Sequence, residues 1–141
     1  MTAVSTYTFP GRFSSLPEIA AIIHLKSVQA GLDEESIYAV ECAVDEACSN
    51  IIEHAYEGED KGDIEMEVRL IKGGIKVILV DHGLPFRPEQ VTDPKINAPL
   101  SKRKASGLGL FMMKKCMDSV DFRFSPGRNI LTMIKLRDSG S

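Results

Sequence analysis

Two neighbouring segments in the middle of the chain limit its fold more than any other feature. Across residues 63–71, apolar and charged side chains alternate, which is the pattern of a strand with one buried face. Residues 75–80 form a denser apolar run that is typical of a more deeply buried strand. Gly73-Gly74 lies between the two segments and predicts a hairpin. We therefore expect a sheet in which these two strands run antiparallel.

Two helices are predicted ahead of this hairpin. The first covers about residues 16–30, and Gly31 lies just past its end, where glycine commonly stops a helix. The second is expected to begin after the capping residue Asp33 and to extend to about Tyr56. Its core-facing stripe consists of apolar residues at helical spacing: Ile37, Val40, Val44, Ala47, Ile51 and Ala55.

The remaining segments complete the pattern. A short strand is predicted at 4–9, a third helix at 108–120, and a closing pair of strands at 121–124 and 130–136. Residues 82–106 contain four prolines and show little periodicity. A loop of this length inside a compact domain is usually functional or mobile, and we interpret it as a lid.

The order of these elements indicates the fold class. Strands outnumber helices and mostly follow one another directly, unlike the alternating order of a doubly wound parallel sheet. We therefore expect one domain over residues 1–141 with an α/β (α+β) two-layer sandwich architecture. Its sheet should be mixed but mainly antiparallel, with the helices packed on one face.

Composition narrows the function classes. The net charge of −3 and the pI near 5.6 give no general reason to expect direct nucleic-acid binding or binding to an anionic membrane. No apolar run reaches the roughly 20 residues of a membrane span, and the polar N-terminal residues lack a signal-peptide pattern. We therefore expect a cytoplasmic protein whose partners are proteins or small molecules. The three cysteines, Cys42, Cys48 and Cys116, are interpreted as reduced core thiols.

A carboxylate and an amide one turn apart in the second predicted helix could form part of a metal-dependent site. Asn50 offers a neutral oxygen to Mg²⁺, which takes its other ligands from water and substrate phosphates. Glu46 could then accept a proton from an attacking hydroxyl. Glu53 and Glu57 share their sector of about 60° on the helix, so a simple solvated polar face is the alternative interpretation.

Asp81 ends the apolar strand, where a rigid backbone can direct its side chain into a crevice beside the sheet. A carboxylate only accepts hydrogen bonds, so it suits the exocyclic amine of adenine and disfavours guanine. Gly83 permits a tight turn and a close approach of the base. For this Asp-His-Gly sequence taken alone, an ordinary turn after a strand is the simpler interpretation.

Two glycines open the third predicted helix. Gly107, Leu108 and Gly109 come just before its apolar residues, so their backbone N–H groups could meet phosphate oxygens at the helix N-terminus. The segment is neither a Walker A loop nor a dinucleotide-binding fingerprint. Lys104 and the two basic residues before it could reach the phosphates across a closed lid. A solvated basic loop is the alternative.

In this order, the three motifs resemble those of the histidine-kinase-like ATPases, and most closely those of small bacterial anti-sigma-factor serine kinases. Residues 46–56 resemble the N box of that family, residues 81–86 its G1 box, and residues 107–118 its G2 box with the following helix. The resemblance covers nearly the whole domain. It implies the two-layer Bergerat fold of the histidine-kinase-like ATPases.

The resemblance also implies roles for individual residues. Asn50 would be the Mg²⁺ ligand, Glu46 the general base and Asp81 the residue that recognises adenine. The implied cofactors are ATP and Mg²⁺. Further nucleotide contacts would come from three glycines: Gly83, Gly107 and Gly109. The chain departs from the family at Gly127-Arg-Asn-Ile, where many relatives have Gly-Thr, so no adenine contact is carried over to that segment.

Family members of this size phosphorylate a serine or threonine of a small antagonist protein and alternatively sequester a sigma factor. The resemblance therefore implies an ATP-dependent serine/threonine-protein kinase that acts as an anti-sigma factor, with the antagonist and the sigma factor as partners. Homodimerisation is implied in the same way. The alternative is an ATP-binding interaction module that regulates a partner without useful catalysis. Glu46 favours the kinase, because the module would not need a base.

Overall fold

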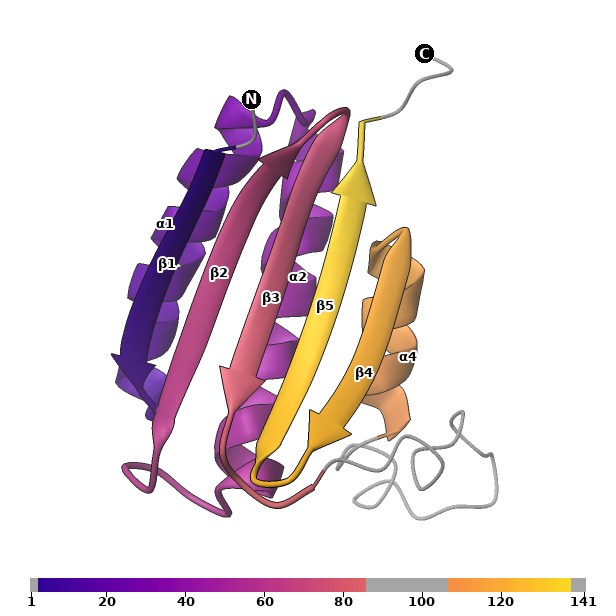
Figure 1. Cartoon of the computed structure of the whole chain (residues 1–141). Coiled ribbons are helices and arrows are strands. Elements are labelled where there is room, and N and C mark those ends of the chain that lie inside the picture. Colours follow the sequence, from indigo (N-terminus) through magenta and orange to yellow (C-terminus); the bar gives the residue numbers. More distant parts are fainter. Residues whose placement is uncertain (1–2, 86–106, 138–141) are drawn as a thin grey trace.

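The computed structural model describes residues 3–85 and 107–137, with the backbone alone described for 107–110. Its elements follow the order that the sequence predicts (Figure 1). In chain order they are β1 (Ala3–Pro10), η1 (Phe13–Ser15), α1 (Leu16–Gln29), α2 (Glu34–Asn50), η2 (Ile51–Ala55), β2 (Asp63–Ile71), β3 (Gly74–Asp81), α4 (Gly107–Cys116), β4 (Ser119–Ser125) and β5 (Arg128–Leu136). Among the helices described here, none is long and apolar enough to cross a membrane.

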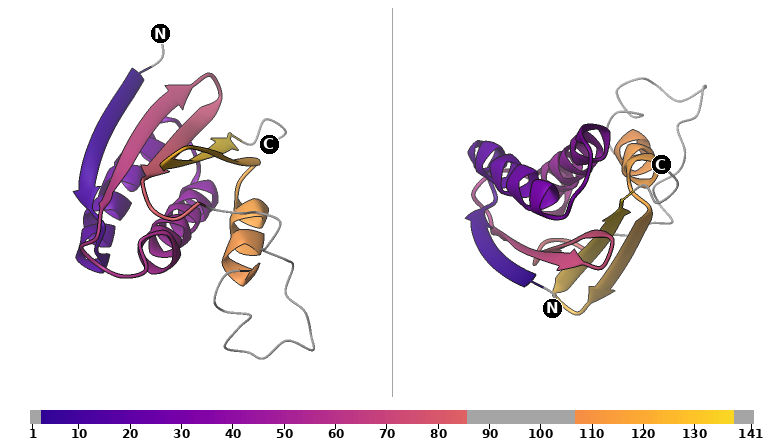
Figure 2. Two further views of the ribbon diagram at one scale, coloured as in Figure 1. Left: turned by 60° about the horizontal axis from the view of Figure 1, so that its bottom comes forward. Right: turned by 90° about the horizontal axis from the view of Figure 1, so that it is seen from above.

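The sheet has the strand order β1-β2-β3-β5-β4, and every pairing between the described strands is antiparallel. Helices α1, α2 and α4 all lie against the same face of the sheet (Figure 1, Figure 2). This arrangement confirms the expected two-layer sandwich with a mainly antiparallel sheet. Because α4 returns the chain before β4 begins, β4 runs in the same direction as β3. β5 lies between them as the antiparallel neighbour of both.

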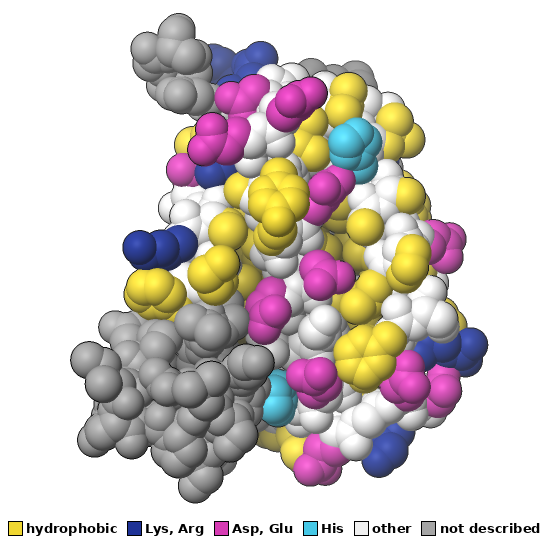
Figure 3. Space-filling view, turned by 180° about the vertical axis from the view of Figure 1, so that it is seen from behind, with side chains coloured by type: hydrophobic (Ala, Val, Ile, Leu, Met, Phe, Trp, Pro, Cys, Tyr) yellow, Lys and Arg dark blue, Asp and Glu magenta, His cyan; other side chains and the backbone are white. Residues whose placement is uncertain are grey.

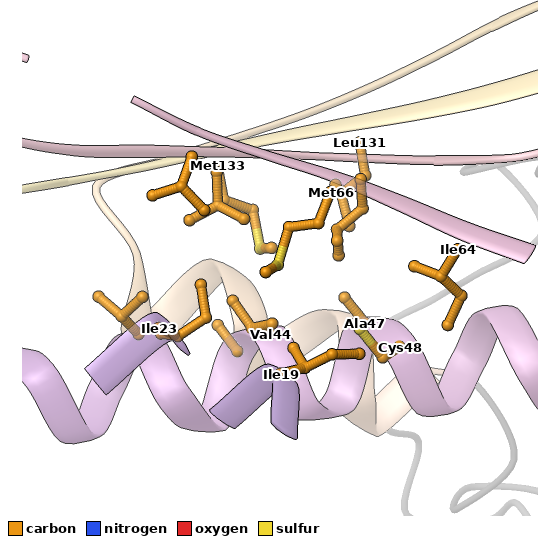
Figure 4. Close-up of a cluster of buried hydrophobic side chains, with 14 of the residues drawn as sticks. Ile19, Ile23, Val44, Ala47, Cys48, Ile64, Met66, Leu131 and Met133 are labelled. Carbon is orange, nitrogen blue, oxygen red and sulfur yellow. The ribbon is translucent and has the colours of Figure 1, made fainter. Parts of the chain in front are cut away.

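The alternating pattern of β2 determines which of its side chains enter the core. Ile64, Met66 and Val68 are buried, whereas Glu65 is exposed on the outer face of the sheet. The predicted stripe of α2 is buried from Ile37 to Ile51, and apolar side chains of both layers meet in one core (Figure 4). Full burial of a large aliphatic side chain contributes about 1.5–3 kcal/mol, so this core supplies the main attraction between the layers.

Helix α2 begins as predicted but changes its geometry before Tyr56. The Asp33 carboxylate caps the helix by accepting a hydrogen bond from the Ser36 N–H at 2.8 Å. After Asn50 the backbone continues as the π-helical turn η2, in which the Tyr56 N–H donates to the Ile51 carbonyl at 2.9 Å. π-Helical turns are rare in proteins, and many of those that occur lie at functional sites. Here the turn directly follows a predicted metal ligand.

Helix α4 is shorter than the sequence predicts. It ends at Cys116 rather than at residue 120, and Val120 already belongs to β4. Asp118 forms the transition, because its N–H donates to the Ile134 carbonyl at 2.9 Å and its Oδ2 accepts from the Leu136 N–H at 2.7 Å. These bonds to β5 are long-range contacts, which helical periodicity along α4 does not reveal.

The three cysteines are free thiols, as the sequence predicts. Cys48 is fully buried in the core, and Cys42 and Cys116 are partly exposed. Burial raises the pKa of Cys48 to about 12, and the nearby charge of Asp45 acts in the same direction. Because the thiolate is the reactive form of cysteine, Cys48 is an inert core side chain.

Ser27 provides a test of the core packing. Its side chain lies in α1 with 0% exposure, and its hydroxyl has no hydrogen-bond partner among the described residues. A buried polar group without a partner costs about 1–3 kcal/mol. We therefore expect Ser27→Ala to raise the free energy of unfolding, as measured by urea denaturation.

Part of this gain would come from the higher helix propensity of alanine. The matched control is Ser49→Ala, which changes a partly exposed serine in α2. The gain from Ser27→Ala should exceed the gain from the control by about 1 kcal/mol. A gain no larger than that of the control would mean that the Ser27 hydroxyl has a hydrogen-bond partner in solution.

Candidate functional site

The elements that carry the three sequence motifs meet at one end of the sandwich. Helix α2 and its extension η2 end there, β3 ends there at Asp81, and α4 begins there at Gly107 (Figure 1, Figure 2). The part of the predicted lid from residue 86 to residue 106 lies outside the described residues. Lys104 and the two basic residues before it lie in that part, so their predicted role stays a prediction.

Glu46 and Asn50 lie one turn apart in α2, and both are partly buried. Glu53, which shares their sector of the helix, is exposed, so this polar face is not uniformly solvated. Burial raises the pKa of Glu46, and the nearby carboxylates of Asp45 and Glu53 raise it further. A carboxylate with a raised pKa takes up a proton more readily, which suits a general base.

Asp81 is the only acidic residue that is buried in the described part of the chain, with 4% exposure. Its Oδ1 accepts hydrogen bonds from the Gly83 N–H at 2.9 Å and from Asn129 Nδ2 at 2.8 Å. Burial raises the pKa of Asp81, whereas these two hydrogen bonds lower it. Because both described donors use Oδ1, the second carboxylate oxygen can accept a hydrogen bond from a ligand.

Asn129 belongs to this site although no sequence pattern identified it. It is buried, with 7% exposure, and lies opposite Asp81 in the register of β3 and β5. Its Nδ2 donates to Asp81 Oδ1 and, at 2.7 Å, to the Leu84 carbonyl. The available signal was the departure from the family pattern at residues 127–130. That signal becomes interpretable only when the sheet places Asn129 beside Asp81.

Gly83 is required by a close contact between two backbones. A Cβ atom at this position would lie 2.4 Å from the Ala55 carbonyl oxygen. The Leu84 N–H donates a hydrogen bond to the same oxygen at 2.8 Å. Glycine therefore permits the turn after β3 to contact the end of η2. The predicted contact of Gly83 with a nucleotide base stays a prediction.

The glycine pair lies at the start of a helix, as predicted. Helix α4 begins at Gly107 and includes Leu108 and Gly109 in its first turn. The first N–H groups of a helix have no partner within the helix, and the helix dipole favours anions at that end. This backbone can therefore bind phosphate oxygens without any basic side chain.

The donor set suits Mg²⁺ held partly by a substrate. Within the described ranges, no group of three or more His, Cys, Asp or Glu side chains could hold a metal ion. Mg²⁺ usually keeps several waters and takes one or two protein ligands together with phosphate oxygens. The Asn50 side chain fits this mode because it is partly exposed and does not cap the turn that follows it.

Comparison with known proteins agrees with this fold. The family described as "Histidine kinase-like ATPase domain" matches residues 9–135. The serine-protein kinase RsbW of Bacillus cereus (strain ATCC 10987 / NRS 248) is 30% identical over an alignment of 122 residues, and the match covers 81% of this chain and 76% of the relative. RsbW of Listeria monocytogenes serotype 4a (strain HCC23) is 29% identical over an alignment of 107 residues, and the match covers 73% of this chain and 68% of that relative.

Two solved structures share the fold. The RsbU and RsbW domains of a Mycobacterium tuberculosis protein match with a TM-score of 0.68 and 17% identity, over 95% of this chain. The chain spans only 32% of that longer protein. The SiaB–SiaC complex from Pseudomonas aeruginosa contains a chain that matches with a TM-score of 0.61 and 14% identity, covering 94% of this chain and 89% of the other.

Asn129→Ala tests the support of Asp81. The variant loses the hydrogen bonds to Asp81 and to the Leu84 carbonyl, so we expect the free energy of unfolding at neutral pH to fall by about 2 kcal/mol. It should also raise the pKa of Asp81 further, because one of the bonds that lower this pKa is lost. Urea denaturation at several pH values measures both effects.

The sign of the pH dependence follows from the raised pKa of Asp81. In the acid range the folded state binds this proton more tightly than the unfolded state, whose carboxyl has its ordinary pKa of 3.8. Stability should therefore fall as the pH rises from about this value through the pKa of the folded state. In Asn129→Ala the fall should extend to higher pH. An equal loss of stability at every pH, or the same pH dependence in an Asp81→Asn background, would contradict this account.

Proposed function

The chain belongs to the histidine kinase-like ATPase domain family, and from this premise we propose that it is a serine/threonine-protein kinase that uses Mg-ATP and acts as an anti-sigma factor. The observation that carries the proposal is the meeting of three groups at one end of the sandwich. These groups are the partly buried pair Glu46 and Asn50, the buried Asp81, and the helix N-terminus at Gly107.

Asp81 would select the base of the nucleotide. Its Oδ2 would accept a hydrogen bond from the exocyclic amine of adenine, while Asn129 and Gly83 hold Oδ1. Guanine carries an oxygen acceptor at the corresponding position, so a carboxylate would repel it. Gly83 would form part of the wall of the same subsite, because glycine lets the turn after β3 pack closely against Ala55 of η2.

The other end of the nucleotide would lie between α2 and α4. Asn50 would be the protein ligand of Mg²⁺, which would neutralise charge on the phosphates when it is bound. The backbone N–H groups of Gly107, Leu108 and Gly109 would donate to phosphate oxygens. Lys104 would add a cation to the same phosphates, as the sequence predicts.

Glu46 would act as the general base of phosphotransfer. Its carboxylate would take the proton of a serine or threonine hydroxyl on the acceptor protein as the hydroxyl oxygen bonds to the γ-phosphorus. The bond from that phosphorus to the β,γ-bridging oxygen breaks, and ADP leaves. The raised pKa of Glu46 suits it to receive the proton.

The partners of this kinase would be proteins. Its relatives are named as RsbW serine-protein kinases, and one structural neighbour was solved as a complex of SiaB with SiaC. We therefore propose an anti-sigma-factor antagonist as the phosphate acceptor and a sigma factor as the alternative partner. Homodimers are proposed from the family resemblance, and a cytoplasmic location from the sequence pattern. The helix-covered face would suit a basic protein surface, because residues 16–57 contain nine acidic residues and one lysine (Figure 3).

The nucleotide site can be tested by calorimetric titration with ATP, ADP and GTP, each with and without Mg²⁺. We expect Mg²⁺-dependent binding of ATP and rejection of GTP. Asn50→Ala should weaken Mg-ATP binding at least about tenfold, since the loss of a ligand should cost no less than the loss of an outer-shell partner. The control Ser49→Ala, in the same helix, should bind normally. Equal binding of ATP and GTP would contradict the role of Asp81.

Glu46→Gln separates catalysis from binding. The variant should bind Mg-ATP with wild-type affinity but transfer phosphate about 10²–10⁴-fold more slowly, because it lacks a general base. Transfer of labelled γ-phosphate to a purified anti-sigma-factor antagonist measures the rate, and Glu35→Gln, an exposed change in the same helix, is the control. A wild-type rate in Glu46→Gln would show that Glu46 is not the base. If the wild-type chain binds ATP but transfers no phosphate, the alternative holds, namely an ATP-binding interaction module.

A further inference from the structure

His82 lies between the two functional residues of the turn after β3, but its ring is on the opposite face of the sheet from Asp81. About half of its side chain is exposed, at 51%. Its Nε2 lies 2.6 Å from Oε2 of Glu65 on β2, and its Nδ1 lies 3.2 Å from the Gly127 carbonyl oxygen in the turn between β4 and β5. One imidazole ring thus connects three parts of the sheet.

The chemistry of the two partners determines the protonation state of this ring. A carboxylate and a backbone carbonyl only accept hydrogen bonds, so each contact requires an N–H on the ring. Neutral imidazole has one N–H and can satisfy one of them, whereas imidazolium has two and can satisfy both. Both hydrogen bonds of His82 can therefore form at the same time only in the cationic form. The hydrogen bond with Glu65, together with weaker contributions from Gly127 and Asp81, also raises the pKa of His82 above its ordinary value of 6.5.

The backbone of His82 is tied to the same end of the molecule. Its N–H donates to the Tyr56 hydroxyl at 3.0 Å, and that hydroxyl donates to the Asp63 carbonyl at 2.6 Å. Tyr56, which follows η2, thus holds the backbone of the turn, and the imidazolium of His82 holds the turn on the outer face of the sheet. Gly127 lies two residues before Asn129, which supports the Asp81 carboxylate from the inner face.

We propose that imidazolium His82 is a positioning residue of the nucleotide site, which clasps the Asp81 turn to Glu65 and to the β4–β5 turn and thereby holds Asp81 and Asn129 in register for adenine. This inference rests on the proposed function, because it assigns His82 to the same nucleotide site. The clasp acts from the outer face of the sheet, so His82 itself does not touch the nucleotide.

The clasp should depend on pH. Two charged groups act on the ring, Glu65 from β2 and Asp81 from β3, and both favour the cation. On β5 the register pairs Asp81 with Asn129, and the exposed Arg128 precedes Asn129. Because the pKa of folded His82 is raised, the clasp is complete below its ordinary value of 6.5 and is lost as the pH rises through the folded-state pKa.

The test uses Mg-ADP as the probe, since it contains adenine and cannot donate a γ-phosphate. Calorimetry would compare the wild-type chain with His82→Gln between about pH 6 and about pH 9. At the lower pH the variant should bind roughly two- to fivefold more weakly, the range expected for an exposed ion pair. The ratio of the two dissociation constants should approach one at the higher pH, where the wild type has also lost the clasp. Taking the ratio cancels the titration of the nucleotide itself.

A second variant checks the cause of the pH dependence. Glu65→Gln keeps an acceptor oxygen but removes the charge, so the pKa of His82 should fall and the loss of affinity should occur at lower pH. An NMR titration of the His82 ring in wild type and Glu65→Gln reads this pKa directly, without nucleotide. His24→Gln is the matched control, because His24 is also exposed and hydrogen-bonded to a glutamate, Glu41, but lies between α1 and α2.

The outcomes separate this inference from the proposed function. If the wild type binds no Mg-ADP at any pH, the nucleotide site is wrong and the inference fails with it. If the wild type binds Mg-ADP but the ratio of dissociation constants is the same at every pH, the proposed function stands and the clasp is overturned. The clasp is supported if the ratio of dissociation constants depends on pH and if Glu65→Gln loses affinity at a lower pH than the wild type does.

Discussion

The contact between the turn after β3 and the end of η2 is the constraint on which the candidate site depends. The Leu84 N–H bonds to the Ala55 carbonyl at 2.8 Å, and only glycine at position 83 allows the two backbones to approach so closely. This contact joins the sheet to the helix layer at the end where α4 also begins (Figure 1). Together with the core that joins the two layers, this contact fixes the position of Asp81 relative to Asn50 at the end of α2.

Asp81 illustrates the cost of building such a site. A buried carboxylate is opposed by desolvation, which is why its pKa is raised. Hydrogen bonds from Gly83 and Asn129 offset part of this cost, but no described lysine or arginine forms an ion pair with the carboxylate. With an apolar residue at a position of this kind, the folded protein would generally be at least as stable. A carboxylate there is therefore better explained by ligand binding than by stability.

Local spacing was enough to predict much of the fold. The bounds of β2 and the buried stripe of α2 follow from alternation and helical periodicity, because these patterns repeat along a single element. The predicted end of α4 at residue 120 was wrong, because hydrogen bonds between Asp118 and β5 end the helix at Cys116. For the site, the motifs indicated which elements should meet, and the structure brings those elements together. The chemical roles of Glu46 and Asn50 remain predictions that binding and phosphotransfer measurements can test.

By itself the sequence determined which side chains of each element face inward and which segments carry Glu46, Asn50, Asp81 and the glycine pair. Such features depend on spacing between residues close together in the chain. Tertiary structure alone decided that Asn129 supports Asp81 and that His82 is held by residues of two other parts of the sheet. Asp81 and Asn129 are 48 residues apart in the chain, and they become neighbours only when β5 pairs with β3. The partner of a buried polar group is thus set by strand pairing, which local periodicity does not encode.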